Sequence, residues 1–398
     1  MRNKSLFISR ALFDITAGIY FAHRLIALSE HGFTTNEAMQ LASITMILGA
    51  ILNIPSGIFS DKFGHKLSTL IGFTMKFVGF FIVSVIHNKL SAFFGFSLYV
   101  VGWCFTDGAF RSWIIYPYRD NKKQLNNINL TLAKITSWGI LLGAIIGSLS
   151  YDFNIMFPWY LGSIFMLIST CLLITTPGPQ KTNPIASNFL QSFKDLPQAF
   201  SVLLKDRLIL NYSMIDLFIY ASFGFFSSSS YPYFNEIFPE SFLARVGILQ
   251  LAISGGRILG NHLVSYINKK NKLLNFANSL FFVFPTFNAL ILLIPLLGYS
   301  PFIFLALIFV RSIILSFYAP KIETILDIIV KPHEKIRAST YSMVEIVRDG
   351  SSAIAMLIAS YLGSFPYKGI WLACFIACIL HSISIYRSKS LTKYLKEL

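Results

Sequence analysis

Long apolar runs separated by short polar segments dominate this sequence. A transmembrane helix needs about 20 mostly apolar residues, and stretches of that kind lie at 5–28, 38–60, 67–87, 91–116, 128–150, 155–176, 207–232, 241–267, 273–297, 300–325, 338–363 and 367–387. The short alternating segments of a membrane β-barrel do not appear. The pattern predicts an all-α polytopic membrane protein with twelve transmembrane helices in two pseudo-symmetric six-helix halves.

A longer polar segment separates the first six stretches from the last six. It covers 177–206, and its apolar residues recur at mostly helical spacing, interrupted by Pro197. We therefore expect an amino-terminal half at 1–176, a cytoplasmic linker at 177–206 with a short amphipathic helix on the membrane interface, and a carboxyl-terminal half at 207–398. Both an ordered linker without a role of its own and a regulatory segment fit this pattern. Two such halves are the repeat layout of many secondary transporters.

The composition and the positions of the charges support a membrane protein. The chain is 55% hydrophobic and only 13% charged, with a formal net charge of +15. Lys and Arg gather at both termini and after every second apolar stretch, whereas the alternate loops hold little beyond Lys89 and Lys368. This positive-inside pattern predicts a multi-pass protein of the cytoplasmic membrane with both termini in the cytoplasm, and it argues against a nucleic-acid partner. Asp14 breaks the first stretch, which we expect to be a retained span rather than a cleaved signal.

A compact charged segment, IPSGIFSDKFGHK, lies between the second and third stretches. Gly57 removes a side chain where two helices approach closely, and Gly64 permits a tight turn. Asp61, near a helix end, can accept hydrogen bonds from a neighbouring helix amino terminus and pair with a cation. A plain positive-inside turn would explain Lys62 and Lys66, but not the glycine spacing or the aspartate.

This segment resembles the signature loop between the second and third helices of major facilitator superfamily transporters, Gly-x-x-x-Asp-Arg/Lys-x-Gly-Arg-Arg/Lys. Five positions match and His65 stands where Arg is usual; the matching residues are Gly57, Asp61, Lys62, Gly64 and Lys66. The resemblance implies the twelve-helix fold of that superfamily and transport by alternating access. It also implies that these residues latch the two halves together in the outward-open state.

Two nearby segments depart from a subgroup of that superfamily. NIPSG is similar to a pattern in which an acid precedes Ile-Pro-Thr/Ser-Gly, but Asn53 occupies the acidic position. DGAFRSW is similar to Ser-Gly-Ala-x-Glu-Ala-Trp, but Arg111 falls where that pattern has Glu. Two acids are lost and one base is gained, which argues against carrying over a cationic substrate.

The fifth stretch contains glycines at four-residue spacing, Gly139, Gly143 and Gly147. It resembles the antiporter motif Gly-x-x-x-Gly-Pro-x-x-Gly-Gly, although Ala144 replaces the Pro and Ser148 the last Gly. Small residues at this spacing are also ordinary devices for close helix packing. We favour the packing interpretation over an antiport-specific role.

Many ionisable residues lie within the predicted spans, where a charge at the bilayer centre costs about 2.5–3.5 kcal/mol unless it faces the bundle interior or water. Asp107 and Arg111 are one helical turn apart and can neutralise each other, and the same holds for Glu345 and Arg348. On the superfamily's map of cavity-lining helices, the resemblance implies that seven of the ionisable residues reach the substrate path: Asp14, Arg111, Asp216, Arg257, Arg311, Glu345 and Arg348.

These residues predict an anionic substrate and a proton-coupling site. Arginine binds carboxylate or phosphate through paired donors, so the predicted substrate-binding residues are Arg111, Arg257, Arg311 and Arg348, with Tyr20, Trp113 and Tyr220 as flat walls. Proton coupling needs an acid whose pKa is raised by burial and whose partner changes between states. The predicted coupling residues are Asp14 first, followed by Asp216 and Glu345.

Together these features predict a secondary active transporter, coupled to protons, for a small organic anion or amphipathic metabolite such as a carboxylate-rich chelator. A multidrug or toxin efflux antiporter is the alternative within transport, and a non-transporting membrane sensor is the alternative outside it. The loops contain no catalytic cluster, so we expect no enzymatic activity, no metal site and no cofactor beyond the proton gradient. The expected partners are the substrate and the lipid bilayer, with the protein acting as a monomer.

Overall fold

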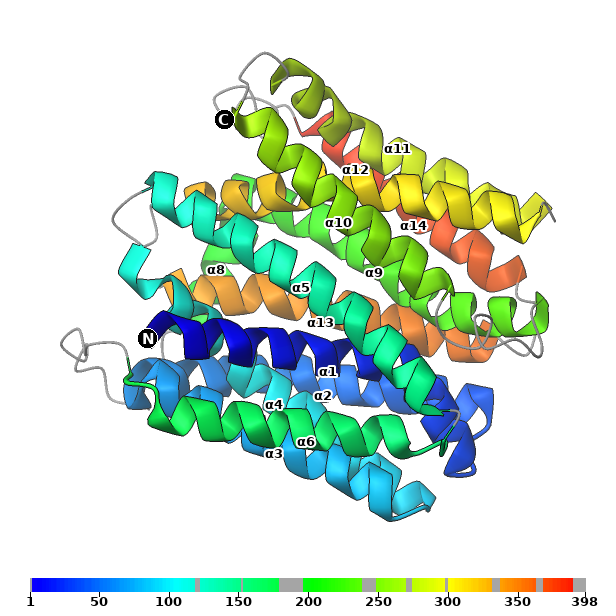
Figure 1. Ribbon diagram of the computed structural model, residues 1–398. Coiled ribbons are helices and arrows are strands. Elements are labelled where there is room, and N and C mark those ends of the chain that lie inside the picture. Colours follow the sequence, from blue (N-terminus) through cyan, green and yellow to red (C-terminus); the bar gives the residue numbers. More distant parts are fainter. Residues whose placement is uncertain are drawn as a thin grey trace. The chain divides into compact units, whose positions relative to one another are not determined.

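In the computed structural model (Figure 1), the described residues are 2–118, 122–151, 153–178, 196–237, 248–269, 274–297, 300–330, 337–362 and 368–388. All regular elements in these ranges are helices, as the apolar pattern predicts. The chain divides into two compact units, Met1–Lys194 and Asp195–Leu398. Twelve of the described helices are 19 to 31 residues long, which is sufficient to span a bilayer.

The amino-terminal unit contains the first six long helices. They are α1 (Arg2–Glu30), α2 (Thr35–Phe63), α3 (His65–Val85), α4 (Lys89–Ile115), α5 (Lys122–Tyr151) and α6 (Phe157–Thr175), with a short 3-10 turn, η1, at Tyr116–Tyr118. Two of the helices begin at capping boxes, in which Thr34 exchanges hydrogen bonds with Glu37 and Asn88 with Ser91. These caps satisfy backbone N–H groups that the helices cannot satisfy themselves.

The carboxyl-terminal unit contains one short helix and six long ones. They are α8 (Leu196–Lys205), α9 (Arg207–Ile237), α10 (Ile248–Lys269), α11 (Leu274–Leu297), α12 (Pro301–Val330), α13 (Arg337–Leu362) and α14 (Lys368–Arg387). The sequence pattern places α8 in a linker, but its Val202 packs against the core of this unit, which includes Ile209 and Tyr212. The part of the predicted linker at 179–195 lies outside the described residues.

The same pairs of helices pack together within each unit. In the first unit α1 packs against α5 and α6, α3 against α4 and α6, and α2 against α4. In the second unit α9 packs against α13 and α14, α11 against α12 and α14, and α10 against α12. When the long helices of each unit are numbered from one to six, these pairs correspond one to one. The contact pattern is that of a six-helix structural repeat.

Close contacts between helices depend on glycine. A methyl group on Gly72 of α3 would lie 2.5 Å from the Gly102 carbonyl oxygen of α4, and one on Gly102 would lie 2.5 Å from the Gly72 carbonyl oxygen. Gly79 and Gly95 form a second such contact between the same helices, at 2.5 and 2.8 Å. Because no side chain separates the backbones, α3 and α4 form a tightly fixed pair.

Judged by length and composition, nine helices in the described ranges could cross a membrane: α1 to α6, α9, α12 and α14. Among the described residues, α11 contributes the apolar segment Phe282–Leu293, and α10 and α13 carry charged residues near their middles, including Arg257 and Arg348. The number of twelve spans therefore stays a prediction.

Candidate functional site

A buried arginine in the carboxyl-terminal unit holds two carboxylates. Arg348 of α13 donates from Nε to Asp216 Oδ2 of α9 at 2.6 Å and from Nη1 to Glu345 Oε1 at 2.7 Å. Its Nη2 donates to the hydroxyl of Tyr212 at 2.7 Å, and the Tyr220 ring centroid lies 5.4 Å from its guanidinium carbon. The side chains of Arg348 and Asp216 are 4% and 2% exposed, whereas that of Glu345 is 40% exposed. The Glu345–Arg348 ion pair expected from their spacing is therefore present.

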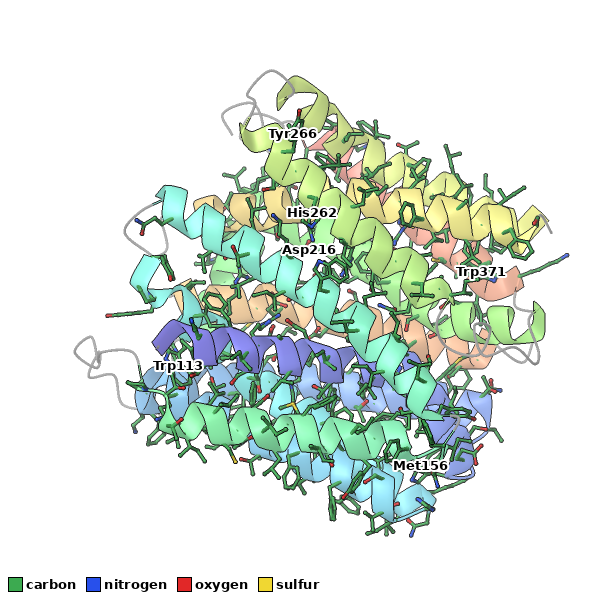
Figure 2. The ribbon with its side chains drawn as sticks, in the orientation of Figure 1. Trp113, Met156, Asp216, His262, Tyr266 and Trp371 are labelled. Atoms are coloured by element: carbon green, nitrogen blue, oxygen red, sulfur yellow. The ribbon has the colours of Figure 1, made fainter. Side chains whose placement is uncertain are left out.

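The packing of α9 against α13 positions this cluster. A methyl group on Gly224 would lie 2.4 Å from the carbonyl oxygen of Ser352, so the two helices approach closely just beyond the ion pairs. Figure 2 marks Asp216 within this unit. With one guanidinium for two carboxylates, the three side chains carry a net negative charge when both acids are ionised. One of the acids can therefore take up a proton while the other keeps its ion pair.

A second buried arginine has no acidic partner. Arg311 of α12 donates from Nε to Asn288 Oδ1 of α11 and is 5% exposed. Its guanidinium carbon lies 5.4 to 5.8 Å from the ring centroids of Phe223, Phe226 and Phe284. No carboxylate forms an ion pair with Arg311 in the described part of the chain. An unpaired guanidinium among aromatic faces is suited to a planar anion, which it can bind with two parallel hydrogen bonds.

The remaining predicted arginines are more accessible. Arg257 lies on α10, is partly buried, and offers its backbone carbonyl to the Ser316 hydroxyl at 3.3 Å. Arg111 is exposed on α4, and so is Asp107. No ion pair joins these two residues, so the mutual neutralisation that their spacing allows does not occur in this structure.

In the amino-terminal unit, Asp14 is part of a buried polar cluster. Arg10, one turn earlier on α1, donates from Nε to Asp14 Oδ2 at 2.8 Å and from Nη2 to the Thr136 hydroxyl of α5 at 2.9 Å. The Thr136 hydroxyl in turn donates to Asp14 Oδ2 at 2.9 Å. All three groups satisfy one another, so Asp14 has a fixed cationic partner in this structure.

The glycine stripe of α5 lies against α1. A methyl group on Gly143 would lie 2.0 Å from the Ile15 carbonyl oxygen, and one on Gly139 would lie 2.5 Å from Asp14 Cβ. At Gly147 the obstacle is the His23 ring, whose Cε1 would be 2.4 Å away. The three glycines thus bring α5 against the face of α1 that carries Asp14 and His23. Close packing of α5 against α1 is therefore sufficient to explain the three glycines.

A fully buried lysine lies in an aromatic cage in the same unit. The Nζ atom of Lys76 on α3 lies 3.9 Å from the ring centroid of Phe13, 4.3 Å from that of Trp103 and 5.3 Å from that of Tyr99. Lys76 is 0% exposed, and its Nζ atom has no hydrogen-bond partner among the residues that the structure describes. Phe13 belongs to α1, whereas Tyr99 and Trp103 lie one turn apart on α4. The cage is therefore assembled from three helices.

Two of the predicted aromatic walls belong to packed cores. Tyr20 stacks on Tyr99 with ring centroids 4.1 Å apart, and it packs in the same core as Trp159. Trp113, marked in Figure 2, is 2% exposed and packs beside Phe110. Such burial favours a packing role for both residues. Tyr220 is only partly buried and lies beside Arg348.

The charged loop between α2 and α3 is a sharp turn at Gly64. Gly64 adopts a φ of 97°, which favours glycine, and its N–H closes α2 on the Ser60 carbonyl at 2.9 Å. His65 Nδ1 forms a hydrogen bond with the Ser60 hydroxyl at 2.8 Å, and Lys66 donates to the Ile174 carbonyl at the end of α6 at 2.8 Å. The side chain of Asp61 lies outside the described residues, Lys62 is exposed, and Gly57 lies within α2.

Several residues that contact the predicted site residues are not themselves predicted by the sequence pattern. Arg10 precedes Asp14 by four residues, and Tyr212 precedes Asp216 by four, so helical spacing alone would have suggested both contacts. Around Lys76, Tyr99 and Trp103 are one turn apart on α4, but no sequence spacing connects them with Phe13 of α1 or with Lys76 of α3. In the described ranges, no three His, Cys, Asp or Glu side chains gather in a way that would hold a metal ion.

The family of the chain is established by comparison with known proteins. The model of the Major Facilitator Superfamily matches residues 6–288. A relative in Bacillus subtilis (strain 168), an uncharacterized MFS-type transporter named YxaM, is 21% identical over 256 residues. That alignment covers 63% of this chain and 61% of the relative, so it spans less than two thirds of the relative's length.

Solved transporters share the fold at low sequence identity. A crystal structure of the nucleoside transporter NupG matches with a TM-score of 0.69 and 15% identity, over 97% of this chain and 99% of that one. A POT family transporter in complex with 5-aminolevulinic acid matches with a TM-score of 0.73 and 15% identity, over 98% of this chain and 96% of that one. The family match and the helical architecture agree: the chain is a multi-pass membrane protein that belongs to the Major Facilitator Superfamily.

Proposed function

We propose that this protein is a proton-coupled secondary transporter of a small organic anion, such as a carboxylate-rich chelator or another amphipathic metabolite. The observation that carries the proposal is the buried cluster in which Asp216 and Glu345 share the single guanidinium of Arg348. A transporter coupled to protons needs an acid whose charge changes during the cycle. This cluster supplies two acids that contact the same guanidinium.

The energetics of burial connect proton uptake to movement in this cluster. Breaking a buried ion pair by removing one partner costs about 3–5 kcal/mol, so Asp216 and Arg348 stay paired unless the lost charge is compensated. Glu345 is the more exposed acid, and we assign the exchange of protons with water to it. When Glu345 takes a proton, Arg348 loses one of the two carboxylates that it contacts, and α13 is freer to shift along α9. We assign the coupling step to Asp216 and Glu345 on these grounds.

Asp14 is the less suitable coupling residue in this proposal. Its carboxylate shares Oδ2 between Arg10 and the Thr136 hydroxyl, with no second acid in the cluster. An acid with a dedicated cation retains its charge. Asp14 then serves to fix α1 against α5, next to Gly139.

The surroundings of Arg311 are our reason for proposing an anionic substrate. Its described polar contact is the amide oxygen of Asn288, and three phenylalanine rings surround the rest of the guanidinium. A buried guanidinium without a carboxylate is costly on its own, and a carboxylate or phosphate group of the substrate would compensate it. Arg257 and Arg111, which are accessible, are the further arginines assigned to this path.

The charged loop and the topology complete the proposal. Lys62 and Lys66 place the α2–α3 turn, and with it both termini, on the cytoplasmic side. The Gly57–Lys66 loop then acts as the latch of alternating access, with Asp61 as its acid. The protein acts as a monomer in the cytoplasmic membrane and takes its energy from the proton gradient.

The test is uptake of radiolabelled citrate, as the probe anion, into proteoliposomes with and without a pH gradient. We expect uptake that the gradient stimulates and that R311Q reduces by about ten- to hundredfold, the value of one or two charge-assisted hydrogen bonds. R311K should retain part of the activity because lysine keeps the positive charge but lacks the paired N–H donors of the guanidinium. The matched control is K89Q, which removes an exposed cation whose partner is Glu37 and should leave uptake unchanged.

Each alternative function has its own outcome in this assay. Gradient-driven movement of the cation ethidium without movement of citrate would establish the multidrug alternative. Binding of citrate without any flux would indicate a sensor. Unchanged uptake in R311Q would remove Arg311 from the substrate path.

A further inference from the structure

The primary amine of Lys76 is buried among aromatic rings. The amine is fully buried, and no hydrogen-bond acceptor contacts Nζ within the described structure. Its neighbours are the faces of Phe13, Trp103 and Tyr99 at 3.9, 4.3 and 5.3 Å. A merely structural lysine would reach water with its ammonium group or pair with a carboxylate.

An aromatic cage differs from an ion pair in how it treats the two charge states. Burial of an ammonium group penalises its charged form, and aromatic faces compensate part of that penalty when the site is dry. The two contributions have opposite signs, and the neutral amine fits the same apolar surroundings without penalty for charge. An ion pair with a dedicated cation, such as Arg10–Asp14, instead favours the charged form of its acid.

We propose that Lys76 Nζ carries an exchangeable proton and is a coupling residue of the amino-terminal unit. The inference rests on the proposed proton-coupled transport and adds a residue, from a different unit and of a different chemical type, to the acids assigned above. Lysine is suited to the role because its amine can exist in both charge states, which arginine cannot.

The proton needs an acceptor, and we assign Asp107 to this role. Asp107 lies one helical turn beyond Trp103 on α4, and its side chain is exposed. In the release step an N–H bond of the ammonium breaks, its electron pair stays on Nζ, and the proton is relayed through a water molecule to form an O–H bond on the Asp107 carboxylate. The carboxylic acid then gives the proton to water. Uptake is the reverse of these two transfers.

The charged and titratable groups around Lys76 come from two of the helices near it. Asp107, Cys104 and Tyr99 belong to α4, and Arg10 and Asp14 belong to α1. Helix α6, which also packs against α3, has no charged residue, and α2 has its charges only at its two ends. Lys76 is therefore an isolated amine among groups that are paired or turned to solvent.

Because the cage is built from three helices, helix movement can change whether the amine of Lys76 stays enclosed. Gly72 and Gly102 fix α3 against α4, so Lys76, Tyr99 and Trp103 move as one body. The third ring, Phe13, belongs to α1, which packs mainly against α5 and α6. A shift of α1 relative to the α3–α4 pair removes Phe13 from the cage and exposes the amine, which links its protonation to the conformational state.

The experiment uses Trp103 as a reporter that requires no transport assay. A positive charge 4.3 Å from the indole ring alters its emission, so the emission of the purified full-length protein is titrated between about pH 5 and pH 10. The W103F variant is subtracted to remove the signals of the other tryptophans. We expect a single titration step in the wild type that is absent in both K76M and K76R, since methionine never carries the proton and arginine never loses it.

The controls make either answer conclusive. Thermal melting shows that the variants are folded, and should K76M not fold, the comparison of the wild type with K76R decides alone. A titration step that persists in K76M or K76R assigns the proton to another group and overturns the proposal. A flat wild-type profile also overturns it. Neither result touches the proposed transport, which citrate flux tests separately.

Discussion

At the scale of single residues, buried charges are stabilised in two different ways. Arg348 and Arg10 are held by carboxylates, whereas Arg311 and Lys76 are surrounded by aromatic rings. Paired charges are costly to change, and caged ones can gain or lose a partner. The Arg10–Asp14 pair therefore holds the structure in one state, whereas Arg311, Lys76 and the exposed acid of the Arg348 cluster, Glu345, are the groups assigned to respond to a ligand or a proton.

The Arg348 cluster predicts a non-additive pattern of stability. R348M alone removes the guanidinium that Asp216 and Glu345 both contact and should lower the free energy of unfolding by about 3–5 kcal/mol. The triple variant D216N/E345Q/R348M removes the charges of all three side chains and should recover most of that loss. The measurement is chemical unfolding in detergent micelles. A triple variant that is less stable than R348M would show that the cluster is held by something other than charge pairing.

Much of the residue-level chemistry was visible in the sequence. Ionisable groups within apolar stretches are conspicuous because their burial is costly, and Asp14, Asp216 and Arg348 all lie in buried polar clusters. Their partners on the same helix follow from spacing. The cage of Lys76 was not predictable, because its rings come from α1 and α4 and only the packed structure brings them together.

At the scale of helices, glycine decides which pairs approach closely. The stripe on α5 meets α1, Gly72 and Gly102 join α3 to α4, and Gly224 brings α9 to α13. The four-residue spacing on α5 predicts one helix face lined by small residues, but the identity of the facing helix depends on the fold. Of the helices that carry these contacts, α13 corresponds to the apolar stretch at 338–363 although charged residues lie near its middle.

Two glycines provide a matched comparison for this account. In G143A the new methyl group would lie 2.0 Å from the Ile15 carbonyl oxygen, so α1 and α5 must separate. In G108A the methyl group meets nothing within 4 Å, and the helix gains up to about 1 kcal/mol of intrinsic propensity. We expect G143A to lower the melting temperature in detergent and G108A to leave it unchanged or raise it. Equal effects of the two substitutions would contradict the packing role of the stripe.

At the scale of the whole molecule, the repeated contact pattern and the family match point to the same architecture. The pairs α1–α5 and α9–α13 occupy equivalent places in their units, and so do α2–α4 and α10–α12. From the sequence, the division into halves followed from a polar segment and the count of apolar stretches. The placement of α8 did not, because its assignment depends on which core Val202 joins.

The positive-inside pattern predicts the sidedness of two loops. In a variant without the four native cysteines, K89C should react with a membrane-impermeant maleimide added outside intact cells. K205C, at the end of α8, should react only after the membrane is permeabilised. The readout is the mass shift of the labelled protein. The opposite pattern of labelling would invert the topology and place both termini outside.

Proton movement in step with the substrate is the central claim of this account. The most direct measurement is the luminal pH of proteoliposomes, read from a trapped pH-sensitive dye, after citrate is added outside at equal starting pH. We predict a citrate-dependent change in luminal pH in the wild type that is lost in D216N/E345Q. Entry of radiolabelled citrate with no change in luminal pH would contradict the claim.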